Sequence, residues 1–383
     1  MENRRKTVYY VCYYAEPKFS NSIVSYPSVW SKIEYVSDVI KENGYDVCYV
    51  CPVMPLSGRF KKKVVVKDAH EKHVHFYAYR NPKISVINKM NALFQIFQIL
   101  LYLLLHSNSE DRILIYHSMF HVEWTWILKK IFKRNFILEI EDIYSALSPE
   151  GVKFENKEWN SFELANGFLC VNALIEHKIR NHAPKIISHG RYALPDIIAN
   201  RKVDKCRLVY AGVIEQVRKG AFLAAEAMKY LPKQYELIIL GFGKDADIDE
   251  LKRVIEKINS EKGWKCIQYL GYMTGNDYLC ELQQCSIALS THMYDESNMK
   301  SADYTFPSKL LIYMANGLQI VAQNLQCLRT SKINDYIAYY EKQPPQDVAK
   351  AVQTIDIDQA YNSRKKIQDL DREFCQQMGE LLR

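Results

Sequence analysis

Residues 304–322, with the sequence YTFPSKLLIYMANGLQIVA, contain the side chains best suited to hold a phosphorylated ligand. Pro307 stands just before a predicted helix, Ser308 is a good N-cap residue, and Lys309 lies in the first turn. The start of a helix offers free backbone N–H groups and the positive end of the helix dipole, so a lysine beside it completes a diphosphate site. On local pattern alone, an ordinary capped helix with a solvated lysine is the simpler interpretation.

Three predicted strand ends earlier in the chain carry glycines. They are the segments 208–212 (LVYAG), 240–243 (LGFG) and 270–272 (LGY). Arg218 and Lys219 follow the first segment, and either is our second choice, after Lys309, for a cation at a diphosphate, although surface charges before a helix give the same pattern. Gly241 and Gly243 predict a tight turn that lets the backbone approach a ligand. A dinucleotide fingerprint is the weaker alternative, because Ala246 stands where a third glycine is usual.

Three carboxylates stand at the predicted carboxyl end of a strand in the first half of the chain, in the segment 138–144 (LEIEDIY). Alternation places Glu139 and Glu141 on one face of the strand and Asp142 beyond its end. Activation of a hydroxyl group needs a general base within hydrogen-bond reach, and we take Glu141 or Asp142 as the candidate. Acids that merely cap the next segment are the favoured alternative.

His117 and His121 follow another predicted strand of the first half, residues 113–116. We keep His117 as a catalytic candidate, although a packed or loop histidine is the simpler interpretation for both. Cys48 and Cys51 form a C-x-x-C pattern inside a strand, where residues three apart point to opposite faces. A second pair at zinc spacing is lacking, so we expect no metal site.

Strand-like and helix-like segments must position these residues, and they alternate along nearly the whole chain. In the first half the predicted strands are 7–13, 45–50, 64–66, 74–77, 113–116, 136–140, 167–171 and 185–188, and the predicted helices are 30–43, 84–105, 122–132, 154–165 and 173–181. In the second half the strands are 207–211, 237–240, 267–270, 287–290, 319–322 and 337–340, and the helices are 220–230, 248–258, 277–284, 308–315, 348–354 and 360–382. This alternation predicts parallel sheets with helices on both faces.

A polar stretch with Pro195 and without clean periodicity separates the two halves. The predicted fold class is therefore α/β, with two doubly wound Rossmann-like domains that face a cleft. We place the first domain at residues 1–195 and the second at 196–360. A C-terminal helix follows at 361–383, and packing back on the first domain is one arrangement open to it. Ligands of open α/β sheets bind at the carboxyl ends of the strands.

The order and spacing of these segments resemble those of the GT-B glycosyltransferases, especially their family 4-like group. The run PSKLLIYMANGL at 307–318 is similar to the signature Pro-Ser-Lys-Leu followed by Tyr-Met-Ala-x-Gly-Leu, with Gln319 in place of the usual proline. The segment 208–212 with Arg218-Lys219-Gly220 resembles the family's Y-x-G and K-G opening, 241–243 its G-x-G turn, and 270–272 its L-G-x strand end near the nucleotide base. The detailed match covers about residues 207–322, and the first half agrees in architecture only.

The resemblance implies that the second domain, residues 196–360, binds a nucleoside diphosphate sugar as the donor and that the first, residues 1–195, binds the acceptor. The expected donor-site residues are Lys309, Ser308, Pro307, Arg218, Lys219, Gly212, Gly241, Gly243, Tyr272 and Tyr304. One departure is clear, because many members carry two glutamates eight positions apart, and Tyr304 and Ile312 stand at those positions here. This removes the usual carboxylate for the ribose and leaves the phosphate site. Glu296 or Asp303 in the preceding loop is a substitute, with a solvated loop acid as the simpler interpretation.

We therefore expect a glycosyltransferase that moves a sugar from a UDP-sugar to a glycan or lipid-linked glycan acceptor, in the synthesis of a surface polysaccharide or glycoconjugate. The donor is a substrate rather than a cofactor. The resemblance implies that no metal is required, because basic residues stabilise the charge on the leaving diphosphate. Two alternatives stay open, namely a sugar-nucleotide epimerase of the same fold and a non-catalytic GT-B partner subunit whose donor site has decayed.

Composition and charge narrow the class of protein. The chain has 383 residues, of which 51 are lysine or arginine and 44 are aspartate or glutamate, so the formal net charge is +7. That excess suits anionic lipid or phosphate ligands, but the dense charge run of a nucleic-acid-binding arm is missing. Ten irregularly spaced cysteines argue against a disulfide scaffold, and the start of the chain lacks a secretory pattern. We expect a cytoplasmic protein with reduced thiols.

Residues 93–105, LFQIFQILLYLLL, are the most apolar stretch of the chain. As a helix they would reach about 20 Å, against about 30 Å of membrane hydrocarbon, so a span is the least favoured interpretation. We favour a buried helix of an α/β domain. The alternative is a helix that rests on a membrane surface, which would add a peripheral contact at the inner face of the plasma membrane.

Overall fold

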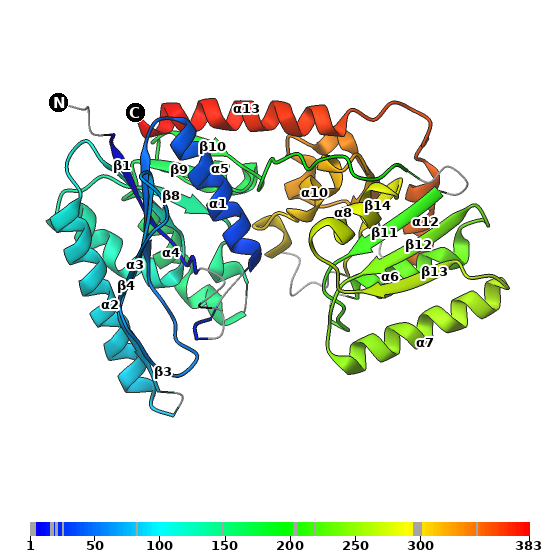
Figure 1. Ribbon diagram of the computed structural model, residues 1–383, viewed down its shortest axis with the longest axis horizontal. Helices are drawn as coiled ribbons and strands as arrows, with labels where there is room; N and C mark the ends of the chain where they lie inside the picture. Colours follow the sequence, from blue (N-terminus) through cyan, green and yellow to red (C-terminus); the bar gives the residue numbers. More distant parts are fainter. Residues whose placement is uncertain are drawn as a thin grey trace. The chain divides into compact units, whose positions relative to one another are not determined.

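The computed structural model describes the chain except residues 1–4, 16–18, 20–21, 25–26, 82, 148, 202–205, 218, 294–300 and 342–343. It divides into two compact units (Figure 1). The first unit comprises Met1–Arg191 and Arg372–Arg383, and the second comprises Tyr192–Asp371. Helix α13 (Ser363–Leu382) therefore begins in the second unit and ends in the first.

The first unit contains an eight-stranded sheet in the order β10-β9-β8-β7-β1-β2-β5-β4. The strands are β1 (Thr7–Val11), β2 (Asp46–Cys51), β4 (Lys63–Val66), β5 (Glu71–His75), β7 (Arg112–Tyr116), β8 (Ile137–Ile140), β9 (Gly167–Cys170) and β10 (Lys185–Ile187). The helices are α1 (Pro27–Glu42), α2 (Ser85–His106), α3 (Met119–Trp126), α4 (Glu155–Phe162) and α5 (Ala173–Lys178), and α3 continues into a π-helical turn, Ile127–Ile131. The central strands are nearly continuous apolar runs because helices cover both faces of the sheet.

Antiparallel pairing at one edge of the first unit departs from the predicted parallel sheet. The edge strand β4 pairs antiparallel with β5, and β3 (Gly58–Phe60) and β6 (Ala78–Arg80) form a separate antiparallel ribbon. Strands β3, β4 and β6 are three or four residues long, too short to show a periodicity in the sequence. The remaining strand pairs of the eight-stranded sheet are parallel, as predicted.

The second unit contains a six-stranded parallel sheet in the order β13-β12-β11-β14-β15-β16. The strands are β11 (Cys206–Ala211), β12 (Tyr235–Leu240), β13 (Ile267–Gly271), β14 (Ile287–Ser290), β15 (Gln319–Gln323) and β16 (Ile337–Tyr340). The helices are α6 (Gly220–Ala227), α7 (Asp245–Lys262), α8 (Gly275–Gln283), α10 (Lys309–Ala315), α11 (Gln326–Arg329) and α12 (Pro345–Gln353). The strand order reverses between β11 and β14, which is where open α/β sheets bind ligands.

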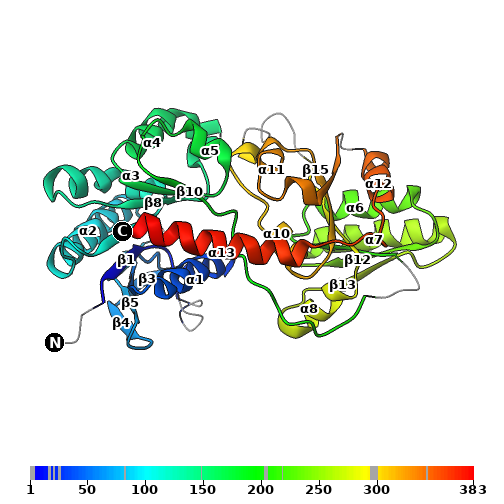
Figure 2. The ribbon, with the colours of Figure 1, turned by 90° about the horizontal axis from the view of Figure 1, so that it is seen from above.

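Helix α2 lies on the first sheet, where Tyr102 packs against Tyr9 of β1 with ring centroids 6.3 Å apart. Among the residues that the structure describes, α2 is the helix long and apolar enough to cross a membrane. The prediction of a buried helix is only partly right. Five of its residues are buried, whereas Leu93 and Leu105 are 67% and 69% exposed. Figure 2 shows α2 along the side of the first unit, next to α3.

Candidate functional site

A cavity of about 220 Å³ lies at the carboxyl ends of β11, β12 and β13 in the second unit. Its lining residues are Ala211, Gly212, Val213, Leu240, Gly241, Phe242, Tyr272, Met273 and Tyr278. The structure therefore brings together three of the predicted donor residues, Gly212, Gly241 and Tyr272. This cavity is the candidate ligand site, because it lies beside the point where the strand order reverses.

Two glycines let the turns after β11 and β12 run against each other. Gly241 has φ +148°, and a Cβ there would lie 1.9 Å from the carbonyl oxygen of Gly212. A Cβ on Gly243 would lie 2.2 Å from the carbonyl oxygen of Ile214, whose N–H donates to Phe242 O at 2.8 Å. Only glycine, which has no Cβ, allows the two backbones to come this close. The G-x-G pattern is therefore required by packing, and it also leaves the backbone open to a ligand.

Lys309 lies beside the same turn. Its Nζ is 4.8 Å from the ring centroid of Tyr210, and it lies 3.7 Å from the position that a Cβ on Gly212 would take. Helix α10 is fixed there by Tyr313, whose hydroxyl donates to Ala211 O at 3.2 Å and accepts from Ala211 N–H at 3.1 Å. The predicted cation and the predicted glycine are thus neighbours, although they are almost one hundred residues apart in the sequence.

The predicted N-cap role of Ser308 is wrong. Ser308 already has helical dihedral angles, φ −54° and ψ −20°, and its side chain makes no capping hydrogen bond. The turn begins one residue earlier, since Leu310 N–H donates to Pro307 O at 3.0 Å and Leu311 N–H donates to Ser308 O at 3.1 Å. Such i to i+3 hydrogen bonds are common in the first turn of a helix. Pro307 precedes this turn and is half-buried, whereas Ser308 is exposed.

The other predicted donor residues are not part of the cavity lining. Lys219 is exposed in a left-handed conformation, φ 47°, and lines a separate hollow with Phe222 and Met293. Tyr304 is half-buried, and its N–H donates to Ser301 O at 3.1 Å. Arg218 and Glu296 lie outside the described residues.

An aromatic pair projects from the rim of the cavity. Phe242 and Tyr272 are 55% and 66% exposed, and their rings meet edge to face with centroids 5.3 Å apart. Exposed aromatic rings at the rim of a cavity provide a surface on which a nucleobase can stack. The sequence predicted Tyr272 as a donor residue, but Phe242 entered only as the middle residue of G-x-G. The pairing of the Phe242 ring with Tyr272 was therefore not predicted.

In the first unit the predicted acids form a network with a buried lysine. Lys32 of α1 is 7% exposed, and its Nζ forms an ion pair with Glu141 and donates to Ser188 O at 2.9 Å. Glu139 is fully buried and accepts a hydrogen bond from the hydroxyl of Tyr10. Within the described residues, Glu139 Oε1 accepts no hydrogen bond.

Burial and the neighbouring charge of Glu141 affect both remaining acids. They raise the pKa of Glu139 to about 7 and that of Asp142 to about 6. Burial is the larger cause in both cases, because it disfavours the charged form. Glu141 is committed to its ion pair with Lys32, whereas Asp142 makes no hydrogen bond within the described residues and is only half-buried. Of the two predicted candidates for a general base, Asp142 is the better placed to accept a proton.

His117 is 2% exposed, and its contacts favour a positioning role over a catalytic one. Its Nε2 lies 2.7 Å from Glu158 Oε1. Glu158 also accepts from the N–H groups of Tyr144 and Ser145, both at 2.8 Å. The pair thus holds the turn that follows Asp142. The sequence did not predict a role for three further residues of this network, Lys32, Tyr10 and Glu158. Each lies in an ordinary strand or helix pattern, and no local feature indicates its partner.

The high pKa of Glu139 predicts a pH-dependent stability. A carboxyl whose pKa is raised on folding binds its proton more tightly in the folded state, so its favourable contribution is present below about pH 4.5 and is lost as the pH rises toward 7. Glu139→Gln removes this dependence. At about 1.4 kcal/mol per pH unit, the variant should gain about 3 kcal/mol relative to the wild type between pH 4.5 and 7.

Urea unfolding at a series of pH values measures this difference. Glu163→Gln, the same change at an exposed position, is the matched control and should leave the pH slope unchanged. Equal pH slopes for Glu139→Gln and wild type would show that folding does not raise the pKa of Glu139.

Comparisons with known proteins agree with this arrangement. Residues 205–356 match the family model for glycosyl transferases group 1, and a search of curated proteins gives no match. One similar solved structure is described as trehalose-6-phosphate from E. coli bound with UDP-2-fluoro glucose; it is 9% identical, the match covers 98% of this chain and 97% of that chain, and the TM-score is 0.64. A second is sucrose-phosphate synthase from Thermosynechococcus elongatus, which is 15% identical, with 98% of each chain covered and a TM-score of 0.64. A third is HepE from Anabaena in complex with UDP, which is 12% identical, with 96% of this chain and 95% of that chain covered and a TM-score of 0.58. At such low identities the likeness establishes the fold.

Proposed function

We propose that this chain, a glycosyltransferase with a GT-B fold and a group 1 glycosyl transferase domain, transfers a sugar from a UDP-sugar to a glycan or lipid-linked glycan acceptor. The observation that carries the proposal is the placement of Lys309 beside the Gly212 and Gly241 turns. Transfer breaks the bond between the anomeric carbon and the diphosphate, and the negative charge that then grows on the diphosphate requires a cation or oriented N–H groups.

The preference for UDP rests on three observations. Phe242 and Tyr272 offer a stacking surface at the cavity rim, and a pyrimidine is the smallest base that can use it. Two of the structural neighbours are described with UDP or a UDP-sugar analogue. Ile312, at the position where the family often has a ribose-binding glutamate, is 43% exposed and apolar. The base and the diphosphate must therefore provide most of the donor binding.

For the acceptor we propose a lipid-linked or otherwise membrane-proximal glycan, in surface polysaccharide or glycoconjugate synthesis in the cytoplasm. The basic excess of the chain and the exposed apolar side of α2 support this choice. Asp142 in the first unit is the proposed acceptor of the hydroxyl proton, and the proposal requires no metal or cofactor. The predicted roles of Lys219 and Arg218 as further phosphate-binding cations stay part of the proposal.

A thermal-shift titration with UDP, GDP, ADP, CMP and NAD tests the donor. A ligand that binds only the folded state stabilises it by about 2.7 kcal/mol at a hundredfold excess over Kd, so a selective shift with UDP is the expected result. A selective shift with another nucleotide would change the donor. No shift with any of them would favour the non-catalytic partner subunit.

Removing the aromatic rim should weaken UDP binding strongly. Each base–aromatic stack contributes about 1–3 kcal/mol, so Phe242→Ala with Tyr272→Ala should raise the Kd for UDP about ten- to hundredfold. Isothermal titration calorimetry measures this Kd. Phe154→Ala, which removes an exposed ring from the first unit, is the control and should leave it unchanged. If the double variant binds UDP as the wild type does, the base lies elsewhere.

A further inference from the structure

Helix α2 presents a stripe of apolar side chains to solvent. The exposed members are Val86, Met90, Leu93, Phe94, Phe97, Leu101, Leu104 and Leu105. They recur at intervals of three and four residues, so they share one side of the helix along its whole length. Soluble proteins seldom expose a contiguous apolar patch larger than a few hundred Å², and a patch of that kind marks a binding surface.

The opposite side of α2 is fastened to the first unit. Gln95 Nε2 donates to Val53 O at 2.7 Å, and Gln98 Nε2 donates to Tyr77 O at 3.0 Å. Tyr102 packs on Phe76 with ring centroids 5.6 Å apart. Crossing a bilayer would break all of these contacts. The geometry therefore suits a helix that lies flat on an apolar surface with its inner side still on the sheet.

The end of α3 and the turn that follows it carry two further exposed apolar residues. Trp126 and Ile131 are more than half exposed. Arg134 reaches from the end of this turn to the end of α2, where it donates to Ser107 O at 3.0 Å. Figures 1 and 2 both draw α2 and α3 side by side. We call the eight exposed apolar residues of α2, together with Trp126 and Ile131, the α2 face.

The two segments that carry the α2 face contain only basic charged residues, and the nearest acids in the sequence, Glu110, Asp111 and Glu123, lie just outside them. The segments 83–106 and 124–136 contain no aspartate or glutamate, and they contain Lys83, Lys89, Lys129, Lys130, Lys133 and Arg134. A second copy of the same face would meet like charges. The charge pattern instead complements an anionic surface.

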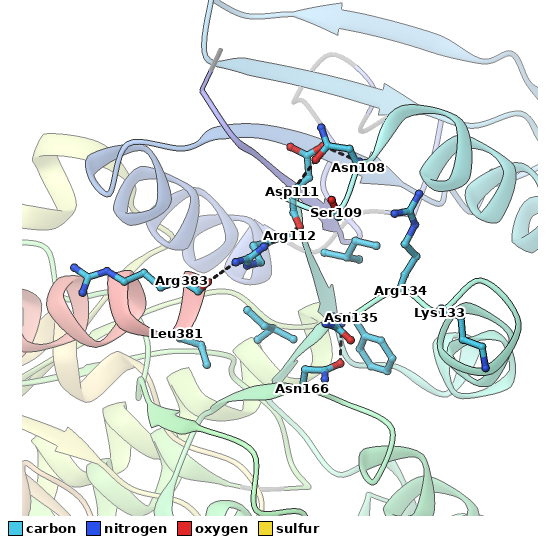
Figure 3. Close-up of a pocket in the computed structure, with 13 residues that line it drawn as sticks. Asn108, Ser109, Asp111, Arg112, Lys133, Arg134, Asn135, Asn166, Leu381 and Arg383 are labelled. Carbon is cyan, nitrogen blue, oxygen red and sulfur yellow. Dashed lines mark hydrogen bonds between the residues drawn. The ribbon is translucent and has the colours of Figure 1, made fainter. Parts of the chain in front are cut away.

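A cavity of about 390 Å³ lies at the end of α2 (Figure 3). Arg112, which Figure 3 shows beside Arg383, is committed to backbone carbonyls, among them Leu382 O at 2.8 Å. Arg134 also lines the cavity, and its buried Nε has no hydrogen-bond partner within the described residues. Lys133 lines it as well and is exposed. Lys133 can therefore meet a phosphate at the edge of the apolar stripe, and Arg134 adds its positive charge there while its guanidinium donates to Ser107 O.

We propose that the α2 face docks peripherally on a bilayer of anionic phospholipid, with Arg134 and Lys133 at the level of the lipid phosphates. The apolar stripe enters the boundary between headgroups and acyl chains, and the surrounding lysines bind the headgroups. This inference goes beyond the proposed function, because docking needs neither a donor nor sugar transfer.

Flotation of the full chain with vesicles tests the proposal. Wild-type protein should float with vesicles of phosphatidylcholine containing one third phosphatidylglycerol, and far less with phosphatidylcholine alone. Leu93→Glu with Phe97→Glu should abolish binding. Lys130→Glu with Lys133→Glu should weaken it at least tenfold, because each surface cation contributes roughly fivefold. The matched controls are Val152→Glu, an exposed apolar residue outside the α2 face, and Lys252→Glu with Lys257→Glu on α7.

Four outcomes would overturn the proposal. They are absence of wild-type binding to the anionic vesicles, equal binding by the Leu93→Glu/Phe97→Glu variant, retention of the protein in the membrane after high-salt and carbonate washing, and a dimer in analytical ultracentrifugation that this variant converts to monomer without any vesicle binding. UDP binding by each variant, measured without vesicles, separates loss of docking from loss of fold or of donor binding.

Discussion

Replacing Lys309 by alanine should lower kcat/KM for sugar transfer from a UDP-sugar by about 100- to 1000-fold. Loss of one preorganised group that stabilises developing charge typically has an effect of this size. Lys309 Nζ is held above the Tyr210 ring, beside the turn of Gly212, so its charge is already in place before the bond to the diphosphate breaks. The larger part of the loss should appear in kcat, because the charge on the diphosphate grows in the transition state.

Lys309→Arg and Lys365→Ala are the matched variants for this experiment. The arginine keeps the positive charge and should restore part of the activity. Lys365 lies on α13 in an exposed pair with Asp369, and its replacement should change kcat/KM by less than twofold. Near-normal transfer by Lys309→Ala, with an unchanged melting temperature, would mean that Lys309 is a solvated helix residue and that other groups stabilise the diphosphate.

The grouping of three candidate donor residues around one cavity could be predicted from the sequence for a physical reason. A parallel sheet places the carboxyl ends of its strands at one edge, so Gly212, Gly241 and Tyr272 had to meet once the strands were identified. Lys309 joins them because Tyr313, one turn further along α10, is bonded to the backbone of Ala211. The spacing of the predicted motifs was therefore enough to predict which of these residues lie close together. Ser308 does stand directly before α10, but its own dihedral angles are already helical and its side chain makes no capping hydrogen bond, which residue type alone does not reveal.

The acid network of the first unit could not be predicted to the same degree. Sequence alternation identified Glu139, Glu141 and Asp142 as a group, but the partner that controls them, Lys32, lies more than one hundred residues earlier in α1. In the sequence, Lys32 is one of many lysines next to an apolar stripe. Its burial depends on the crossing of α1 over the strand ends, which is a property of tertiary packing. The sequence likewise left open which side of α2 is covered, because apolar residues occur on both its buried and its exposed sides.

The second large effect is expected from Lys32→Met. This change leaves Glu141 without its counterion and Ser188 O without its donor, next to the buried Glu139. Removing one partner of a buried ion pair typically destabilises a protein by about 3–5 kcal/mol, and we expect that loss for the first unit. The matched change Lys365→Met, which breaks the exposed pair with Asp369, should lower the free energy of unfolding by less than about 1 kcal/mol.

The double variant Lys32→Met/Glu141→Gln distinguishes loss of charge pairing from loss of packing. If the unpaired carboxylate of Glu141 causes the destabilisation, replacing it by a neutral amide should recover about half or more of the lost free energy of unfolding. An uncharged amide is far less costly to bury than an unpaired charge. If the double variant is as unstable as Lys32→Met alone, the defect lies in the packing of α1. Saturating UDP raises the midpoint of unfolding of the unit that binds it. The effect of Lys32→Met should therefore be measured on the unfolding transition whose midpoint UDP does not change.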